Sequence, residues 1–337
     1  METFALPPND GRRRPGLYHL SHAACCLLAL LLLSACAGYR GPDRLQAEPA
    51  LYEATPPSSP AARFAPLLLV EASQFPYNRP GSPRLARGAD GAITAVVDPD
   101  RPVLFFQEER FAGRHGTYRN LIYRVHFSEV PPGHLTSGAN VGLVIVVTVD
   151  DADRPVLYTT AHTCGCYLAI VPTSHLPAQA LPPGWDRQTQ NVYGEILPGL
   201  LTLPAAGGQG RLQLTLRSET HRVMDMRLVT GQDVGTTALS LPLLPMATLR
   251  QLPLDGRNAS FFEETGASKG YVRHSGKFWE RLLISWWALD SRVGEDKDLG
   301  PAAETGVIFY TSLKPWAREA SDLWRFQAFL DYWGWRL

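Results

Sequence analysis

The chain has 337 residues, 45% of them hydrophobic, and its 32 basic and 32 acidic side chains give a formal net charge of zero. This length suffices for one large folded domain or two modest ones, and the apolar content is typical of a globular core. Because basic residues are not in excess, the composition excludes nucleic-acid binding driven by charge.

The N-terminal 35 residues have the three parts of a secretory signal. Arginines at 12–14 precede an apolar segment from Ala23 to Leu33, and the small residues Ser34 and Ala35 follow it. The apolar segment has 11 residues, whereas a helix that spans a membrane needs about 20. We therefore predict that residues 1–35 are a signal peptide and that the apolar segment is its core.

The segment Leu33-Ser34-Ala35-Cys36 resembles the lipobox of bacterial lipoproteins. The resemblance implies cleavage before Cys36, a diacylglycerol on its thiol and an acyl chain on the new amino group. Two or three chains anchor firmly, because each buried methylene contributes about 0.8 kcal/mol. In that family an aspartate after the cysteine retains the protein in the inner membrane. Ala37 at this position therefore favours the outer membrane, with the chain facing the periplasm.

Residues 36–66 are rich in proline, alanine and serine, which predicts a solvated tether behind the lipidated cysteine. Strand signals dominate residues 67–254, and prolines and glycines punctuate them as in antiparallel sheets. The β-branched run Val141–Val149 indicates a central strand that is covered on both faces. The other expected strands are Val103–Gln107, Tyr118–Val130, Val156–Val171, Arg211–Leu216 and Arg222–Val229.

Residues 270–337 change in character and complete a globular domain that we place at 67–337. Apolar residues between Lys277 and Leu289 fall in two neighbouring rows, which predicts a helix with a broad apolar face. Glu304–Ser312 is expected to be a strand. Pro315 then opens a second expected helix, which Gly334 closes, with one apolar stripe made of Leu323, Phe326, Leu330 and Trp333.

These patterns predict an α+β fold, in which a β-rich antiparallel body carries two C-terminal helices packed on it. Seven of the eight tryptophans lie between Trp279 and Trp335. They have two interpretations at this point. One is aromatic packing of the helices on the sheet, and the other is a tryptophan-lined surface that meets a membrane or a ligand.

The strongest chemical candidate is the segment around His162, Cys164 and Cys166. If it is extended, the period of two places these three side chains on one face, and His175 could fold back toward them. Cys25 and Cys26 leave with the leader and Cys36 is lipidated, so this close pair holds the only other cysteines.

Three chemistries remain open for this segment. Thiolates and imidazole suit zinc or cuprous copper, although a single cysteine pair is unlike most zinc sites. A Cys-Gly-Cys disulfide ring is strained and therefore labile, and Gly165 supplies the flexibility that it needs. Alternatively, the cysteines are small hydrophobic side chains in the core.

The same segment, together with Gly294–Asp298 and the C-terminal Trp-Gly-Trp-Arg-Leu, is similar to an uncharacterised group of bacterial lipoproteins. That resemblance carries no known activity. Gly266–Gly270 matches the pattern of a nucleophile elbow but lacks the strand and helix that the elbow requires. Asp290–Asp298 lacks oxygen ligands at the third and fifth positions of a calcium loop, and we expect it to be a solvated turn.

The sequence thus favours a non-catalytic envelope lipoprotein, an accessory or binding module for an unknown ligand. The membrane is its expected partner, through the lipid on Cys36. The alternative is a thiol-redox or metal-handling envelope protein that works through His162, Cys164 and Cys166, with zinc or copper as the possible metal.

Overall fold

The computed structural model describes residues 48–56, 60–203, 210–230 and 238–337. All of them belong to one compact unit. The predicted signal peptide, the lipidation at Cys36 and the first part of the expected tether lie outside the described residues. The later part of that tether is not free chain, because Ala50–Thr55 is a strand of the main sheet.

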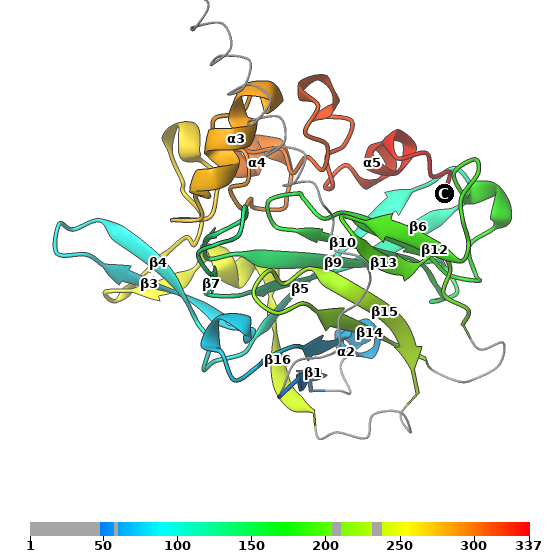
Figure 1. Cartoon of the computed structure of the whole chain (residues 1–337), viewed down its shortest axis with the longest axis horizontal. Coiled ribbons are helices and arrows are strands. Elements are labelled where there is room, and N and C mark those ends of the chain that lie inside the picture. The colour runs from blue at the N-terminus through cyan, green and yellow to red at the C-terminus, as the bar shows by residue number, and fades with distance from the viewer. Residues whose placement is uncertain (1–47, 57–59, 204–209, 231–237) are drawn as a thin grey trace, which may run out of the picture. The chain divides into compact units, whose positions relative to one another are not determined.

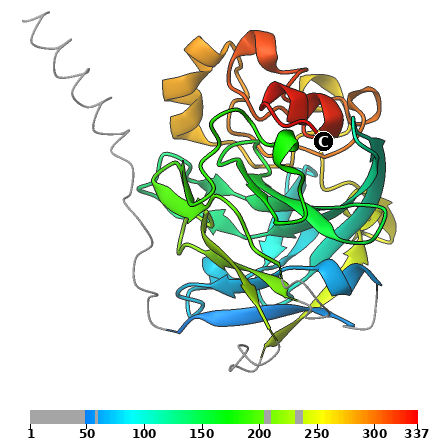
Figure 2. The ribbon, with the colours of Figure 1, turned by 90° about the vertical axis from the view of Figure 1, so that its right-hand side faces the viewer.

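A curled, ten-stranded mixed sheet forms the body of the unit (Figure 1, Figure 2). Its strand order is β11-β10-β9-β6-β5-β16-β1-β2-β14-β15. The strands are β1 (Ala50–Thr55), β2 (Leu67–Val70), β5 (Leu104–Ala112), β6 (Thr117–His126), β9 (Gly142–Val149), β10 (Pro155–His162), β11 (Ala169–Pro172), β14 (Arg211–Leu216), β15 (Val223–Val229) and β16 (Leu239–Pro245).

The expected antiparallel body was only partly right. The strands from β5 to β11 pair antiparallel, as do β1 with β2 and β14 with β15. However, β16 pairs in parallel with both β5 and β1, and β2 pairs in parallel with β14. Parallel neighbours need long crossover connections, and here these connections join strands that are far apart in the sequence.

Short elements complete the unit. Four hairpins stand beside the main sheet: β3 (Ser82–Arg87) with β4 (Ile93–Asp98), β7 (Glu129–Val130) with β8 (Gly138–Ala139), β12 (Thr189–Val192) with β13 (Glu195–Pro198), and β17 (Leu252–Leu254) with β18 (Arg257–Ala259). The α-helices of the described residues are α2 (Pro60–Phe64), α3 (Phe278–Ala288), α4 (Ala302–Thr305) and α5 (Phe326–Tyr332). Each of the 3-10 turns spans three to five residues: η1 (Pro76–Asn78), η2 (Ala178–Ala180), η3 (Met246–Arg250), η4 (Gly266–Ser268) and η5 (Pro315–Ala317).

Two apolar cores cover the two faces of the sheet. Every residue of β9 is buried, which confirms the expected central strand. Leu143 and Ile145 belong to the core inside the curl, whereas Val144 and Val146 belong to the core on the opposite face. This alternation follows the period of two in a strand. The second core also contains residues of the C-terminal segment, among them Phe309, Phe329, Leu330 and Trp335.

The C-terminal segment departs from the sequence prediction in its details. Helix α3 is present where it was expected, but Glu304–Ser312 is not a strand, because α4 occupies its start. Pro315 opens only the short turn η5, and α5 begins at Phe326. Three members of the predicted stripe are buried, namely Leu323, Phe326 and Leu330. Trp333 is 38% exposed and is not a core residue.

In both views, α3, α4 and α5 lie together at one end of the unit, and β1 and β2 lie at the other (Figure 1, Figure 2). None of the helices among the described residues has the length and the hydropathy that a membrane span requires.

Candidate functional site

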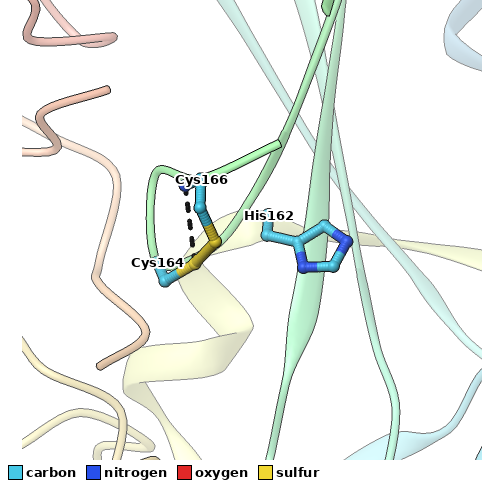
Figure 3. Close-up of side chains that lie close together, drawn as sticks. All are labelled: His162, Cys164 and Cys166. Atoms are coloured by element: carbon cyan, nitrogen blue, oxygen red, sulfur yellow. Dashed lines mark hydrogen bonds between the residues drawn. A yellow bond between two sulfur atoms is a disulfide. The ribbon is translucent and has the colours of Figure 1, made fainter. Parts of the chain in front are cut away.

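The turn that follows β10 forms the centre of the candidate site. His162 ends the strand, and its backbone N–H donates to the carbonyl oxygen of Cys166 at 2.9 Å. A disulfide joins Cys164 to Cys166 across this turn (Figure 3). Gly165 lies between them with a positive φ of 93°. A Cβ atom at Gly165 would lie 2.0 Å from the carbonyl oxygen of Tyr310, so only glycine fits this close approach.

Three of the four residues predicted for a metal or redox site come together. One ligand atom from each of His162, Cys164 and Cys166 lies within 4.8 Å of the other two. The expectation for His175 was wrong. Strand β11 runs antiparallel to β10 and carries the chain back to the start of β10, where His175 Nδ1 lies 3.3 Å from the carbonyl oxygen of Pro155. The seven residue steps from Pro155 to His162 span about 23 Å in an extended strand.

His162 is a buried, neutral imidazole. Its Nε2 lies 3.3 Å from the carbonyl oxygen of His221. Since a carbonyl only accepts, this nitrogen carries the hydrogen, which leaves Nδ1 as an acceptor. Burial, assisted by the positive charge of Lys277, holds the pKa of His162 well below its ordinary value. The ring also packs edge-on against Tyr167, with 4.7 Å between the ring centroids.

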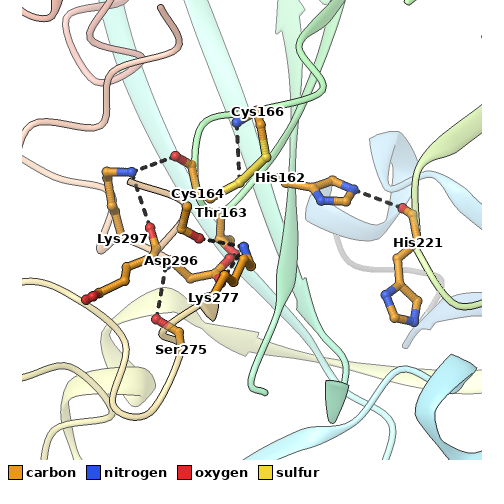
Figure 4. Close-up of a disulfide and its surroundings, with 11 residues drawn as sticks. His162, Thr163, Cys164, Cys166, His221, Ser275, Lys277, Asp296 and Lys297 are labelled. Atoms are coloured by element: carbon orange, nitrogen blue, oxygen red, sulfur yellow. Dashed lines mark hydrogen bonds and ion pairs between the residues drawn. A yellow bond between two sulfur atoms is a disulfide. The ribbon is translucent and has the colours of Figure 1, made fainter. Parts of the chain in front are cut away.

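A buried ionic cluster lies on the other side of the turn (Figure 4). Asp296 pairs with Lys277 at 3.2 Å and accepts a hydrogen bond from the hydroxyl of Thr163. Lys297 Nζ donates to the carbonyl oxygen of Cys164 at 2.6 Å. The backbone N–H of Asp296 donates to the hydroxyl of Ser275 at 3.0 Å.

This cluster corrects the prediction of a solvated turn at Asp290–Asp298. Residues 293–300 are all buried, because Asp296 and Lys297 find their partners in segments that are distant in the sequence. Sequence reasoning noticed the run Gly294–Asp298 but missed its role. The alternation of acidic and basic residues in that run was the one available signal of internal pairing.

The buried charges have shifted acid–base properties. Burial lowers the pKa of Lys297 to about 8, so its ammonium form still predominates at neutral pH. Burial opposes the charge of Lys277, but the carboxylates of Asp296 and Glu280 outweigh that effect and raise its pKa. Burial raises the pKa of Glu280. The carbonyl oxygen of Cys164 therefore accepts from a charged ammonium group near neutral pH.

The disulfide forms one wall of a pocket of about 260 Å³. Cys164 is 4% exposed, whereas Cys166 is only half-buried and is the more accessible of the two. The opposite walls come from α3 and from the C-terminal segment, through Glu280, Ile284, Trp287, Val293, Gly294, Tyr310, Thr311, Ser312, Leu313, Lys314 and Trp333, and Tyr193 closes one edge. A small group that enters this pocket therefore meets both cysteines of the disulfide.

A second pocket, of about 280 Å³, lies beside His175. Leu203 and Gly210, which form part of its wall, flank residues 204–209 outside the described part of the chain. Its charged lining residues are Arg63, Asp153, Arg154 and Arg211, and it contains neither cysteine. We therefore place the candidate site at the disulfide pocket.

No protein-family model, no curated protein and no solved structure matches this chain. The chemistry of the site must therefore be inferred from its own residues. A disulfide that lines a pocket, next to a neutral imidazole and a buried ammonium group, suits thiol–disulfide exchange, and in the reduced form the same residues suit a soft metal ion.

Proposed function

We propose that this chain is a lipid-anchored envelope protein whose domain carries out thiol–disulfide exchange at Cys164 and Cys166. The observation that carries the proposal is a disulfide between residues only two positions apart that lines an open pocket. Closing so small a loop stabilises the fold by only about 1.5 kcal/mol in the chain-entropy model. Accessible disulfides in strained rings belong to the labile class, so a reactive role explains this bond better than a stabilising one.

The exchange has two steps. A thiolate of a partner dithiol attacks Sγ of Cys166, the bond between the two sulfurs breaks, and Cys164 leaves as a thiolate. The second thiolate of the partner then attacks the partner's first sulfur in the mixed disulfide. That bond breaks, and Cys166 leaves as a thiolate. The partner is oxidised by two electrons, and its two protons end on the thiols of Cys164 and Cys166.

The surroundings favour Cys164 as the leaving group. The backbone N–H of Cys166 lies 3.4 Å from Sγ of Cys164 and donates toward it. The ammonium group of Lys297 lies against the carbonyl oxygen of Cys164. The N–H group places partial positive charge at the sulfur where the thiolate develops, and the ammonium group adds positive charge on the same residue; a stabilised thiolate leaves faster.

Redox titration tests this proposal. The purified domain is equilibrated in glutathione buffers, free thiols are trapped with a maleimide, and the mass is measured. We expect half-reduction between about −270 and −120 mV, the range of thiol oxidoreductases. A disulfide that stays oxidised below about −300 mV would be structural, and the pocket would then belong to a non-catalytic binding module.

Single-cysteine variants test the direction of attack. We expect Cys164→Ser to form a mixed disulfide with glutathione through the accessible Cys166. Cys166→Ser leaves the buried Cys164 and should react at least tenfold more slowly. Equal rates would contradict the assignment of Cys166 as the attacked residue.

We further propose that Cys36 carries the anchor, on the strength of the lipobox alone. Cys36→Ser should abolish labelling with a radioactive fatty acid and release the protein from membranes. Cys164→Ser is the matched control and should keep the label. Unchanged membrane association of Cys36→Ser would exclude this anchor.

Metal handling is the second candidate, because the ligand atoms of His162, Cys164 and Cys166 already lie within 4.8 Å of one another. In the reduced state two thiolates and one imidazole would suit cuprous copper or zinc. The reduced domain should then retain one metal ion per chain after dialysis, and His162→Ala should weaken that binding. Failure to retain either metal removes this candidate.

A further inference from the structure

Helix α3 turns its apolar side chains outward. Glu280 and Ala288 are its only buried residues. Seven large apolar side chains of α3 and of its C-cap residue are between 41% and 72% exposed. Trp287 is the one that also lines the disulfide pocket, and we call the other six the α3 surface: Phe278, Trp279, Leu282, Leu283, Trp286 and Leu289. A helix in a soluble domain normally buries such a face, so we expect a binding partner to cover this one.

A neighbouring segment enlarges the α3 surface. Arg318 donates to the carbonyl oxygen of Leu289 at 3.0 Å, which holds η5 beside the end of α3. Trp316, in η5, is 82% exposed. Fully burying one such side chain contributes about 1.5–3 kcal/mol, so covering several of them would bind the domain firmly to an apolar phase. Large exposed apolar patches mark interaction surfaces.

We propose that the α3 surface inserts into the headgroup region of a lipid bilayer. Tryptophan, phenylalanine and leucine on one face of a short helix are the composition of interfacial helices, in which aromatic rings settle at the headgroup level. The charge pattern agrees. Glu280 is buried, so Arg281 is the only exposed charged residue within α3. Lys314, beside Trp316, is exposed as well. These cations suit anionic headgroups, although Glu319 nearby is an exposed acid.

The length of chain before the described residues permits this contact. The lipid anchor proposed above determines which membrane the α3 surface would meet, and in this respect the inference rests on that proposal. Thirteen residues separate Cys36 from Ala50, and an extended chain over these fourteen steps reaches about 46–50 Å. A domain of this size has a radius of gyration of about 19 Å. A sphere with that radius of gyration is about 49 Å across, so the fully extended tether reaches about one domain width and does not hold Ala50 at the membrane.

Membrane contact would also bring the disulfide pocket to the surface of the bilayer. Glu280, Ile284 and Trp287 on α3 form part of the pocket wall. With the α3 surface inserted, the pocket would lie at the bilayer interface, where it would meet thiols of membrane-bound partners.

Vesicle binding by a form without the anchor tests this proposal. Both apolar cores lie within residues 50–337, so the chain Ala37–Leu337 contains everything that the fold needs. It is mixed with phosphatidylcholine vesicles that contain phosphatidylglycerol, and binding is followed by sedimentation and by tryptophan fluorescence. We expect binding with a blue shift, and at least a tenfold loss of affinity in Leu282→Ser/Trp286→Ser.

A control variant and three contrary outcomes make the vesicle experiment decisive. Val96→Ser/Leu239→Ser replaces two exposed apolar side chains on β4 and β16 and should bind like the unchanged chain. Circular dichroism and thermal unfolding should be unaffected in both double variants, since the side chains are exposed. Absence of vesicle binding, equal losses in the two variants, or a dimer that only the α3 variant dissolves would overturn the proposal. Because the tested form lacks Cys36, failure of the lipid anchor would not affect this result.

Discussion

Gly165 shows how one residue shapes the candidate site. Its positive φ and its contact with the Tyr310 carbonyl oxygen both exclude a side chain. Gly165→Ala should therefore lower the free energy of unfolding by about 2 kcal/mol or more, as measured by urea denaturation. Gly184 has a similar φ of 74° but open space around it, and Gly184→Ala should cost only about 1 kcal/mol. Equal costs would mean that the contact with Tyr310 contributes nothing.

Asp296 gives a second prediction at the same scale. Asp296→Asn keeps the volume of the side chain but removes the carboxylate that pairs with the buried ammonium group of Lys277 at 3.2 Å. Breaking a buried pair in this way costs about 3–5 kcal/mol. Asp255 pairs with Arg87 at the surface, so Asp255→Asn should change stability by less than about 1 kcal/mol. Chemical denaturation of both variants checks the contrast, and a small effect at Asp296 would contradict it.

At the level of elements, the C-terminal segment holds its core contacts through Leu323, which is 3% exposed. Leu323→Ala should cost about 2–5 kcal/mol, because it removes buried methyl groups and leaves a cavity. Leu282, on the α3 surface, is 55% exposed. Leu282→Ala should shift the stability by less than about 0.5 kcal/mol. Thermal unfolding compares the two, and similar shifts would mean that α3 is packed like a core helix.

The sequence predicted where helices and strands lie along the chain better than it predicted whether their apolar faces are covered. The β-branched run at Val141–Val149 became β9, and the periodic segment from Lys277 became α3. Periodicity reports which side chains share a face, but it does not report whether that face is covered. For that reason, the sequence left open whether tryptophans such as Trp286 pack inward or face outward.

The candidate site was foreseen in part for a similar reason. His162, Cys164 and Cys166 are close in sequence, so they were expected to lie together, although the turn after β10 brings them together and not the extended strand on which the expectation was based. Lys277 and Lys297 enter the site through pairings between distant segments, which a local pattern does not contain. The direction of β11 depends on its pairing with β10, and that pairing takes His175 away.

Across the whole molecule, buried histidines predict sensitivity to acid. Burial holds the pKa values of His126, His162 and His221 below the ordinary value, and that of His221 is lowered to about 3. Below pH 6.5 the unfolded chain binds more protons than the fold, so stability is lost as the pH falls. Each histidine contributes a slope of about 1.4 kcal/mol per pH unit. Glu280, with its raised pKa, acts in the opposite direction.

Urea unfolding at pH 7.5, 6 and 5 measures this loss. With three histidines the slope approaches about 4 kcal/mol per pH unit, so a domain of ordinary stability should unfold two to three units below pH 6.5. His221→Gln should lower the slope by about a third. A stability that stays constant from pH 7.5 to 5 would contradict the assignment of these side chains as neutral and buried.

The place of β16 in the main sheet has a consequence for how the chain is made. Thr55 and Ser240 hydrogen-bond across neighbouring strands although they are 185 residues apart. Synthesis of the chain from Thr55 to Ser240 takes about 10–40 s. During that time one edge of β1 has no partner strand. Open strand edges invite aggregation. Slowing synthesis anywhere between β1 and β16 therefore prolongs the exposure of this edge, even though the finished domain shows no trace of it.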